Sequence, residues 1–150
     1  MNAILQPSLY EQLMELPEHV TGEILNSELY AMPRPSGRHA GACSSLGMRI
    51  GPPFCFGDSG PGGWRIIDKP EIHFIRNQEV AVPDLAGWRR ERMPNVPDDH
   101  RFEIVTDWLC EILSPSTAKK RPRGEIAYLC PLRCAVCLDC RSFGANVGSV

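Results

Sequence analysis

Two short apolar runs, each with an acid near its end, most constrain how this chain can fold. They are residues 79–85 (EVAVPDL) and 108–113 (WLCEIL), the second followed directly by SPST at 114–117. Short apolar runs that end at proline or polar turn residues are typical of buried strands. Burying the carboxylate of Asp84 or Glu111 in such a strand is costly unless a cation or a metal pairs with it. The runs therefore predict a site for a hard divalent cation near two strand ends. The alternative is a turn cap at Asp84 and a local Arg or Lys partner for Glu111.

The composition is that of one globular domain. The chain has 150 residues, of which 43% are hydrophobic and 23% charged, and this length is enough to bury a core. No apolar run approaches the roughly 20 residues that a transmembrane helix needs. Residues 1–6 lack the basic and apolar regions of a signal peptide. We therefore expect a cytoplasmic protein with no membrane segment.

The charge is distributed unevenly along the chain. The net charge of −2 argues weakly against a DNA-binding surface. However, Arg89, Arg90 and Arg92 follow Asp84 closely, and a second basic cluster at 119–123 follows Glu111. These flanks predict contacts to a phosphate backbone, or equally well two solvated loops.

Local patterns predict an α/β arrangement. Ser8 and Glu11 have the spacing of a capping box that begins a helix. Proline, glycine and apolar periodicity then divide the rest of the chain. The expected elements are a helix from Ser8 to Pro17, a hairpin over 22–32, a helix over 38–50, a loop over 51–63, strands over 64–67, 71–75 and 79–85, an exposed loop over 89–101, a strand within 102–113 and a helix capped by Ser116. This order predicts a sheet flanked by helices.

Two strings in the chain carry a resemblance to a known family. VPDLAGWRRERMP at 82–94 and EILSPST at 111–117 resemble the Uma two family of restriction endonucleases, which belongs to the PD-(D/E)xK nuclease superfamily. The expected first helix, the hairpin and residues 33–50 also fit the layout of that family, so the resemblance covers about 8–120. It implies a restriction-endonuclease-like mixed sheet flanked by helices, in a domain spanning residues 1–120.

The resemblance also implies an active site. Asp84 would be the acid of the Pro-Asp motif, Glu111 the second metal-binding acid, and Glu23 the hairpin acid that completes the site. The implied chemistry is attack of a Mg²⁺-bound water on a phosphodiester of DNA. Cutting both strands usually needs two active sites, which predicts a homodimer.

The lysine that normally completes such a site is missing. Residue 113 is leucine, so the usual E-x-K spacing after Glu111 is absent. The family places its lysine later, on the helix after SPST, in a string that this chain lacks. Lys119 and Lys120 are candidate replacements. His39, Arg89 and Arg90 are candidate DNA contacts, although a lone histidine is more often structural.

Residues 121–150 do not resemble the family and form an atypical cysteine-rich tail. Cys130, Cys134, Cys137 and Cys140 have the spacing of a zinc or iron–sulfur site, which we consider the weakest interpretation. Codons can be chosen for 121–150 so that reading one base later yields a lysine-bearing helix and a YVWIVD strand, as the family requires. We therefore hypothesise a frameshift near Lys120, with the tail out of frame.

The sequence thus predicts a metal-dependent DNA endonuclease, with a site left incomplete by the loss of its lysine. The alternative is a catalytically dead remnant, or a non-enzymatic DNA- or protein-binding module of the same fold. Cleavage with added Mg²⁺ would favour the nuclease, and DNA binding without cleavage would favour the remnant.

Overall fold

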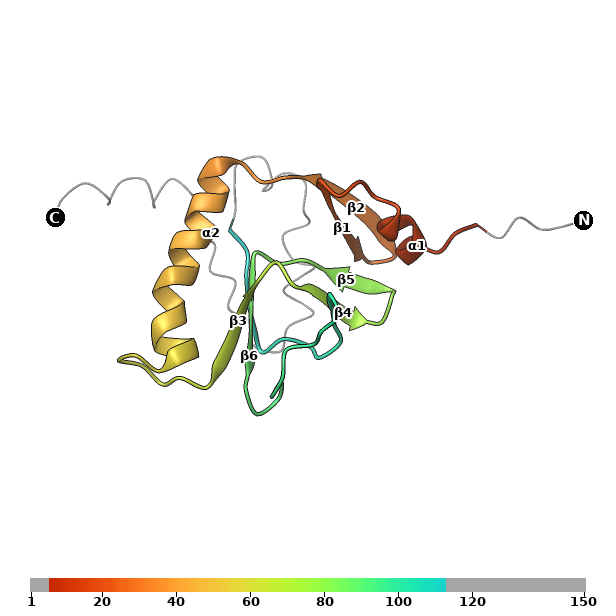
Figure 1. The fold of residues 1–150 in the computed structure, drawn as a ribbon. Helices are drawn as coiled ribbons and strands as arrows, with labels where there is room; N and C mark the ends of the chain where they lie inside the picture. Colours follow the sequence, from red (N-terminus) through yellow and green to blue (C-terminus); the bar gives the residue numbers. More distant parts are fainter. Residues whose placement is uncertain (1–5, 113–150) are drawn as a thin grey trace, which may run out of the picture.

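The structure, a computed structural model, describes residues 6–112. Lys119, Lys120, the helix expected after Ser116 and the tail over 121–150 lie outside these residues. A helix and a hairpin come first, then a longer helix and a π-helical turn, and then the remaining strands (Figure 1). They are α1 (Leu9–Met14), β1 (Val20–Leu25), β2 (Glu28–Pro33), α2 (Gly37–Ile50), η1 (Gly51–Phe56), β3 (Trp64–Asp68), β4 (Glu71–Ile75), β5 (Glu79–Ala81), β6 (Leu85–Arg89), β7 (Arg101–Phe102) and β8 (Trp108–Cys110).

The strands form two sheets. One has five strands in the order β2-β1-β5-β4-β7, and the other has three in the order β3-β6-β8. Neighbouring strands are antiparallel except for β4 and β7, which are parallel. The predicted mixed α/β fold is therefore confirmed, with the strands divided between two sheets.

Local sequence signals at the N-terminal end are confirmed. The Ser8 side chain accepts a hydrogen bond from the Glu11 N–H, and Glu11 accepts one from the Ser8 N–H. This capping box begins α1. In the hairpin of β1 and β2, Asn26 and Ser27 have φ angles of 51° and 61°. Two consecutive positive φ angles match a turn whose twist suits paired strands.

The strand predicted over 79–85 is divided by Pro83. β5 ends at Ala81, and β6 begins at Leu85 in the other sheet. Proline has no N–H to donate to a strand ladder, so the chain leaves the first sheet there. β6 then runs to Arg89, where the sequence predicted the start of an exposed loop.

Two further predictions were wrong in their boundaries. Residues 51–56, predicted as loop, form the π-helical turn η1 directly after α2. Proline is tolerated in a first helical turn, where its missing N–H has no partner to lose. The strand predicted within 102–113 is two short strands, β7 and β8, in different sheets.

The core joins the two sheets. Side chains of Ile72 (β4), Ala86 and Trp88 (β6) and Phe102 (β7) pack in one buried cluster with Met93. On the outside, α2 packs against the three-stranded sheet through a second cluster, and Leu13 of α1 packs on the five-stranded sheet. Figure 1 shows α2 and α1 at opposite ends of the described fold.

Two of the passages between the sheets lie side by side, because the Lys69 N–H donates to the Asp84 carbonyl oxygen. Residues 69–70 lead from β3 to β4, and residues 82–84 lead back from β5 to β6. Residues 111–112 follow β8 at the same level, because Leu85 is paired with Cys110. We call these three segments the crossover. It contains two of the three predicted acids, Asp84 and Glu111.

Candidate active site at the crossover

Strand register places Asp84 between Lys69 and Glu111. Leu85 pairs with Asp68 on one side and with Cys110 on the other, so the position just before β6, Asp84, faces residues 69 and 111. Two backbone contacts continue these ladders. The Lys69 N–H donates to the Asp84 carbonyl oxygen at 3.3 Å, and the Ile112 N–H donates to Asp84 Oδ2 at 2.8 Å.

The Asp84 carboxylate is buried and held by side chains from other elements. The residue is 5% exposed. Its Oδ1 accepts from His39 Nε2 at 2.8 Å and from Lys69 Nζ at 3.0 Å. His39 reaches it from the first turn of α2, where its own N–H donates to the capping Ser36 hydroxyl. The site thus joins the N-terminus of α2 to the crossover.

These partners keep Asp84 ionised. Burial alone raises the pKa of the Asp84 carboxyl, but the hydrogen bonds from His39 and from the Ile112 N–H, with the charge of Lys69, outweigh burial and lower the pKa below its usual value. Asp84 is therefore a carboxylate at neutral pH, as a metal ligand must be.

The other two predicted acids adjoin the same segments. Glu23 on β1 is fully buried, and its Oε1 accepts a hydrogen bond from the Val82 N–H at 2.8 Å. Val82 lies two residues before Asp84. Glu111 is partly buried and directly precedes Ile112, whose N–H binds Asp84. The structure thus gathers all three acids around the crossover.

The donor chemistry of these acids suits a hard cation. Carboxylate oxygens are the ligands that Mg²⁺ prefers, and Mg²⁺ is often held by one or two carboxylates plus waters and substrate phosphates. Within residues 6–112, no group of three or more His, Cys, Asp or Glu side chains is close enough to hold a metal by itself. Asp84 and Glu111 stay the predicted pair of ligands.

Lys69 is a site residue that the sequence analysis missed. It is far from Asp84 in sequence, and only the pairing of β3 with β6 brings the two together. One local signal was present, because Asp68, Lys69 and Pro70 lie between two strand runs and suggest a turn. The structure gives Lys69 a positive φ of 46° in that turn.

Cys43 of α2 also lies against the site, as a donor. Its Sγ contacts Asp68 Oδ1 at 3.3 Å and the Asp84 carbonyl oxygen at 3.6 Å. Burial, together with the hydrogen bond to Asp68, raises the pKa of Cys43 to about 12. The thiol stays protonated at neutral pH, so it is not a nucleophile.

The candidate DNA contacts lie in different surroundings. His39 is 6% exposed and faces Asp84. Arg89 and Arg90 are exposed at the far end of β6, about 16 Å from Asp84 at the usual rise of a strand. The Arg89 guanidinium lies 5.1 Å from the centre of the Trp64 ring, and Arg90 Nη2 donates to the Cys55 carbonyl oxygen at 2.8 Å. The structure does not bring these arginines to the acids.

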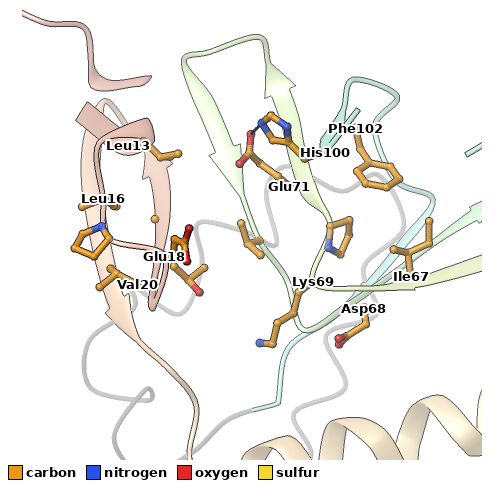
Figure 2. A pocket seen from close by; sticks show the side chains of 15 residues that line it. Leu13, Leu16, Glu18, Val20, Ile67, Asp68, Lys69, Glu71, His100 and Phe102 are labelled. Atoms are coloured by element: carbon orange, nitrogen blue, oxygen red, sulfur yellow. Dashed lines mark ion pairs between the residues drawn. The ribbon is translucent and has the colours of Figure 1, made fainter. Parts of the chain in front are cut away.

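A cavity of about 460 Å³ opens beside the crossover. Figure 2 shows Lys69 and Asp68 at one end and Glu71 with His100 at the other. Leu13, Leu16 and Val20 contribute apolar side chains to its wall. The cavity therefore gives a ligand access to Lys69.

The Glu71 end of this cavity is a separate hydrogen-bonded group. Glu71 Oε1 accepts from the Tyr10 hydroxyl at 3.0 Å and from His73 Nε2 at 2.8 Å. The Asn77 N–H donates to His73 Nδ1 at 3.2 Å, which assigns the ring proton to Nε2. These contacts fasten α1 to β4.

One solved structure has a similar fold. The crystal structure of a "putative nuclease belonging to DUF820" from Anabaena variabilis is similar with a TM-score of 0.57 and 23% identity, over 77% of this chain. The chain spans 65% of the length of that protein. The shared fold is thus that of a protein described as a nuclease.

A family model matches most of the chain. The model of the Uma2 family, described as "putative restriction endonuclease", matches residues 8–135. This chain therefore belongs to the Uma2 family. No curated protein matches it. Among residues 6–112, no helix is long and apolar enough to cross a membrane.

Proposed function

We propose that this chain is an endonuclease that uses a divalent metal, Mg²⁺, to hydrolyse phosphodiester bonds of DNA. The observation that carries the proposal is the ionised Asp84 carboxylate at the crossover, with Glu111 and the buried Glu23 beside it. Family membership supports the same class of reaction.

Each residue of the proposed site has its own role. Asp84 and Glu111 would hold the cation, which when bound lowers the pKa of a coordinated water and offsets charge at the phosphate. His39 and the Ile112 N–H fix the Asp84 carboxylate in one orientation. Glu23 fixes the segment before Asp84 by accepting from the Val82 N–H.

DNA and a second copy of the chain are the proposed partners. Arg89 and Arg90 would contact the DNA backbone away from the cut, since a duplex advances about 3.4 Å per base pair and would span several base pairs between them and Asp84. A homodimer would supply the second active site for the opposite strand. We place this reaction in the cytoplasm.

The family model matches as far as residue 135, and the out-of-frame tail over 121–150 stays a proposal. If the coding DNA carries a frameshift near Lys120, the base-shifted frame restores the family lysine and the missing strand. The restored lysine then takes the place of Lys119 and Lys120 as the candidate active-site lysine. Sequencing the coding DNA across codons 117–150 decides between the two reading frames.

The first test is nicking of supercoiled plasmid by the full 150-residue chain. With Mg²⁺ we expect conversion to the open circular form, and with EDTA we expect none. Glu111→Gln removes a proposed ligand charge, and we expect it to lower the nicking rate by about 100-fold. Glu91→Gln, at an exposed residue of the loop after β6, is the matched control.

Two outcomes contradict the proposal. One is no nicking by the wild type with Mg²⁺ or Mn²⁺, which with retained DNA binding would favour the catalytically dead remnant or binding module. The other is nicking that Glu111→Gln and Glu91→Gln leave equally unchanged, which would indicate a contaminating nuclease.

A further inference from the structure

We propose that Lys69 is the active-site lysine of this chain, placed to neutralise the charge that develops on the phosphate during cleavage. The inference rests on the proposed function. It assigns the role of the active-site lysine to the segment between β3 and β4. The family spacing had suggested Lys119 or Lys120, after Glu111, for this role.

The geometry places the ammonium group at the site itself. Lys69 Nζ lies 3.0 Å from Asp84 Oδ1, and the Lys69 N–H donates to the Asp84 carbonyl oxygen at 3.3 Å. The chain has three lysines, and Lys69 is the one that lies within residues 6–112. Backbone and side chain thus both fix this lysine beside the proposed metal ligand.

The Lys69 side chain is more exposed to solvent than the His39 side chain, which also binds Asp84. The His39 side chain is 7% exposed, whereas the Lys69 side chain is 37% exposed. Lys69 also lines the cavity of about 460 Å³ beside the crossover (Figure 2). Of the two side chains that bind Asp84, Lys69 is therefore the one that an incoming phosphate can reach.

The backbone at Lys69 indicates a position held for its side chain. Its φ of 46° is in the left-handed region, which glycine and asparagine adopt more readily than lysine. Residues in sparsely populated conformations cluster at active sites and ligand clamps. A turn that needed only this backbone shape would be better served by glycine.

Acidic side chains surround Lys69, so its positive charge is needed to attract a phosphate. Asp68, Glu18 and Glu71 line the same cavity, with His100 at the far end. Asp84 and Glu111 add two acids at the crossover. A DNA phosphate would be repelled by these carboxylates unless cations offset them, so Lys69 is placed where that offset is needed.

The chemical role follows from the reaction. A water oxygen bonds to phosphorus, one P–O ester bond breaks, the water releases a proton to solvent, and the leaving oxygen takes up a proton. Negative charge accumulates on the non-bridging oxygens in between. An ammonium group close to those oxygens stabilises that charge more than the charge of the ground state.

The test compares Lys69→Met with Lys69→Arg and with the double variant Lys119→Met/Lys120→Met. We expect Lys69→Met to lower the kcat of nicking by about 100-fold or more. Lys69→Arg retains the charge and should keep a tenth of the activity or better. Arg76→Met, at an exposed cation paired with Glu103, is the matched control and should nick at the wild-type rate. The double variant tests the two lysines that the family spacing suggested.

A second readout does not depend on cleavage. In calorimetric titrations with Mg²⁺ alone, we expect Lys69→Met to bind the metal about tenfold more tightly, because a competing positive charge beside Asp84 is gone. A lysine with a merely structural role would show the opposite, since its loss would disorder Asp84 and weaken metal binding. Lys69→Asn also removes the charge, but asparagine adopts a positive φ readily, so this variant controls for a folding defect in Lys69→Met.

The outcomes separate this inference from the proposed function. If wild type nicks DNA and Lys69→Met nicks equally well, Lys69 is not the lysine of the reaction, while the endonuclease stands. If Lys69→Met loses activity but binds Mg²⁺ more weakly than wild type, Lys69 is structural. If the double variant loses activity instead, Lys119 or Lys120 has the role. If the wild type neither nicks DNA nor binds Mg²⁺, both proposals are overturned.

Discussion

Asp84→Asn is expected to lower Mg²⁺-dependent nicking by about 10²–10³-fold, the usual loss when a group that stabilises the transition state is removed. The amide keeps nearly the same shape but has no charge to offer a cation. Its carbonyl oxygen can still accept from His39 Nε2, which donates to Asp84 Oδ1 in the wild type. The variant therefore separates the charge of Asp84 from its hydrogen-bonding role, with initial rates of plasmid nicking as the measurement.

Asp58→Asn is the matched control for this change. Asp58 is exposed, in the turn that follows η1, so the same substitution there should leave the rate unchanged. Equal nicking by Asp84→Asn and Asp58→Asn would contradict the assignment of Asp84 as a metal ligand.

The same variant has a pH signature in stability. Because the pKa of Asp84 is lowered in the folded chain, its carboxylate stabilises the fold above the pKa of the unfolded chain, near 4. This contribution is lost as the pH falls through the folded pKa. At pH 7 we expect Asp84→Asn to unfold with a free energy about 1.5–3 kcal/mol below that of wild type. At pH 3 the difference should be smaller, and urea unfolding at both pH values measures it.

Trp88→Ala is expected to give the largest loss of stability, about 3–5 kcal/mol of unfolding free energy. Trp88 is fully buried between the sheets and stacks on Phe102 with ring centres 5.1 Å apart. Its indole Nε1 donates to the Ile104 carbonyl oxygen at 2.7 Å. The change opens a cavity and leaves that carbonyl oxygen without its partner, a loss that urea unfolding at pH 7 measures.

Trp64→Ala is the control for the loss of an indole ring. Trp64 is half-buried on β3 and lies under the Arg89 guanidinium. We expect a smaller loss there, because part of the ring already contacts water and an exposed cation–π contact contributes only about 0.5–1 kcal/mol. A larger loss for Trp64→Ala than for Trp88→Ala would mean that the core does not lie between β4, β6 and β7.

The features that the sequence predicted correctly are mostly those that depend on residues close together in the chain. The capping box of Ser8 and Glu11 and the turn at Asn26 and Ser27 are local chemistry, and both are confirmed. The mixed α/β fold is confirmed as well, through the resemblance and the order of the strands. Asp84 and Glu111 were proposed from the apolar runs and the motif, and Glu23 from the resemblance, and their roles in the site stay a prediction.

Tertiary pairing decided what the sequence did not predict. Nothing within residues 79–85 indicates that the strand changes sheet, although Pro83 is the residue that cannot continue the ladder. Lys69 was missed because its contact with Asp84 follows from the register of β3 on β6. His39 was proposed for DNA, and the helix that carries it packs its ring against Asp84. The family spacing points past Glu111, to Lys119 and Lys120, and not to the segment between β3 and β4.

The most direct measurement is the binding of a divalent metal to the full chain. Mn²⁺ can stand in for Mg²⁺ at oxygen ligands, and free Mn²⁺ is counted by electron paramagnetic resonance. We predict saturable binding to wild type that is lost in the Asp84→Asn/Glu111→Gln double variant and kept in Asp58→Asn. Equal binding by wild type and the double variant, or no binding by either, would contradict a metal site at the crossover.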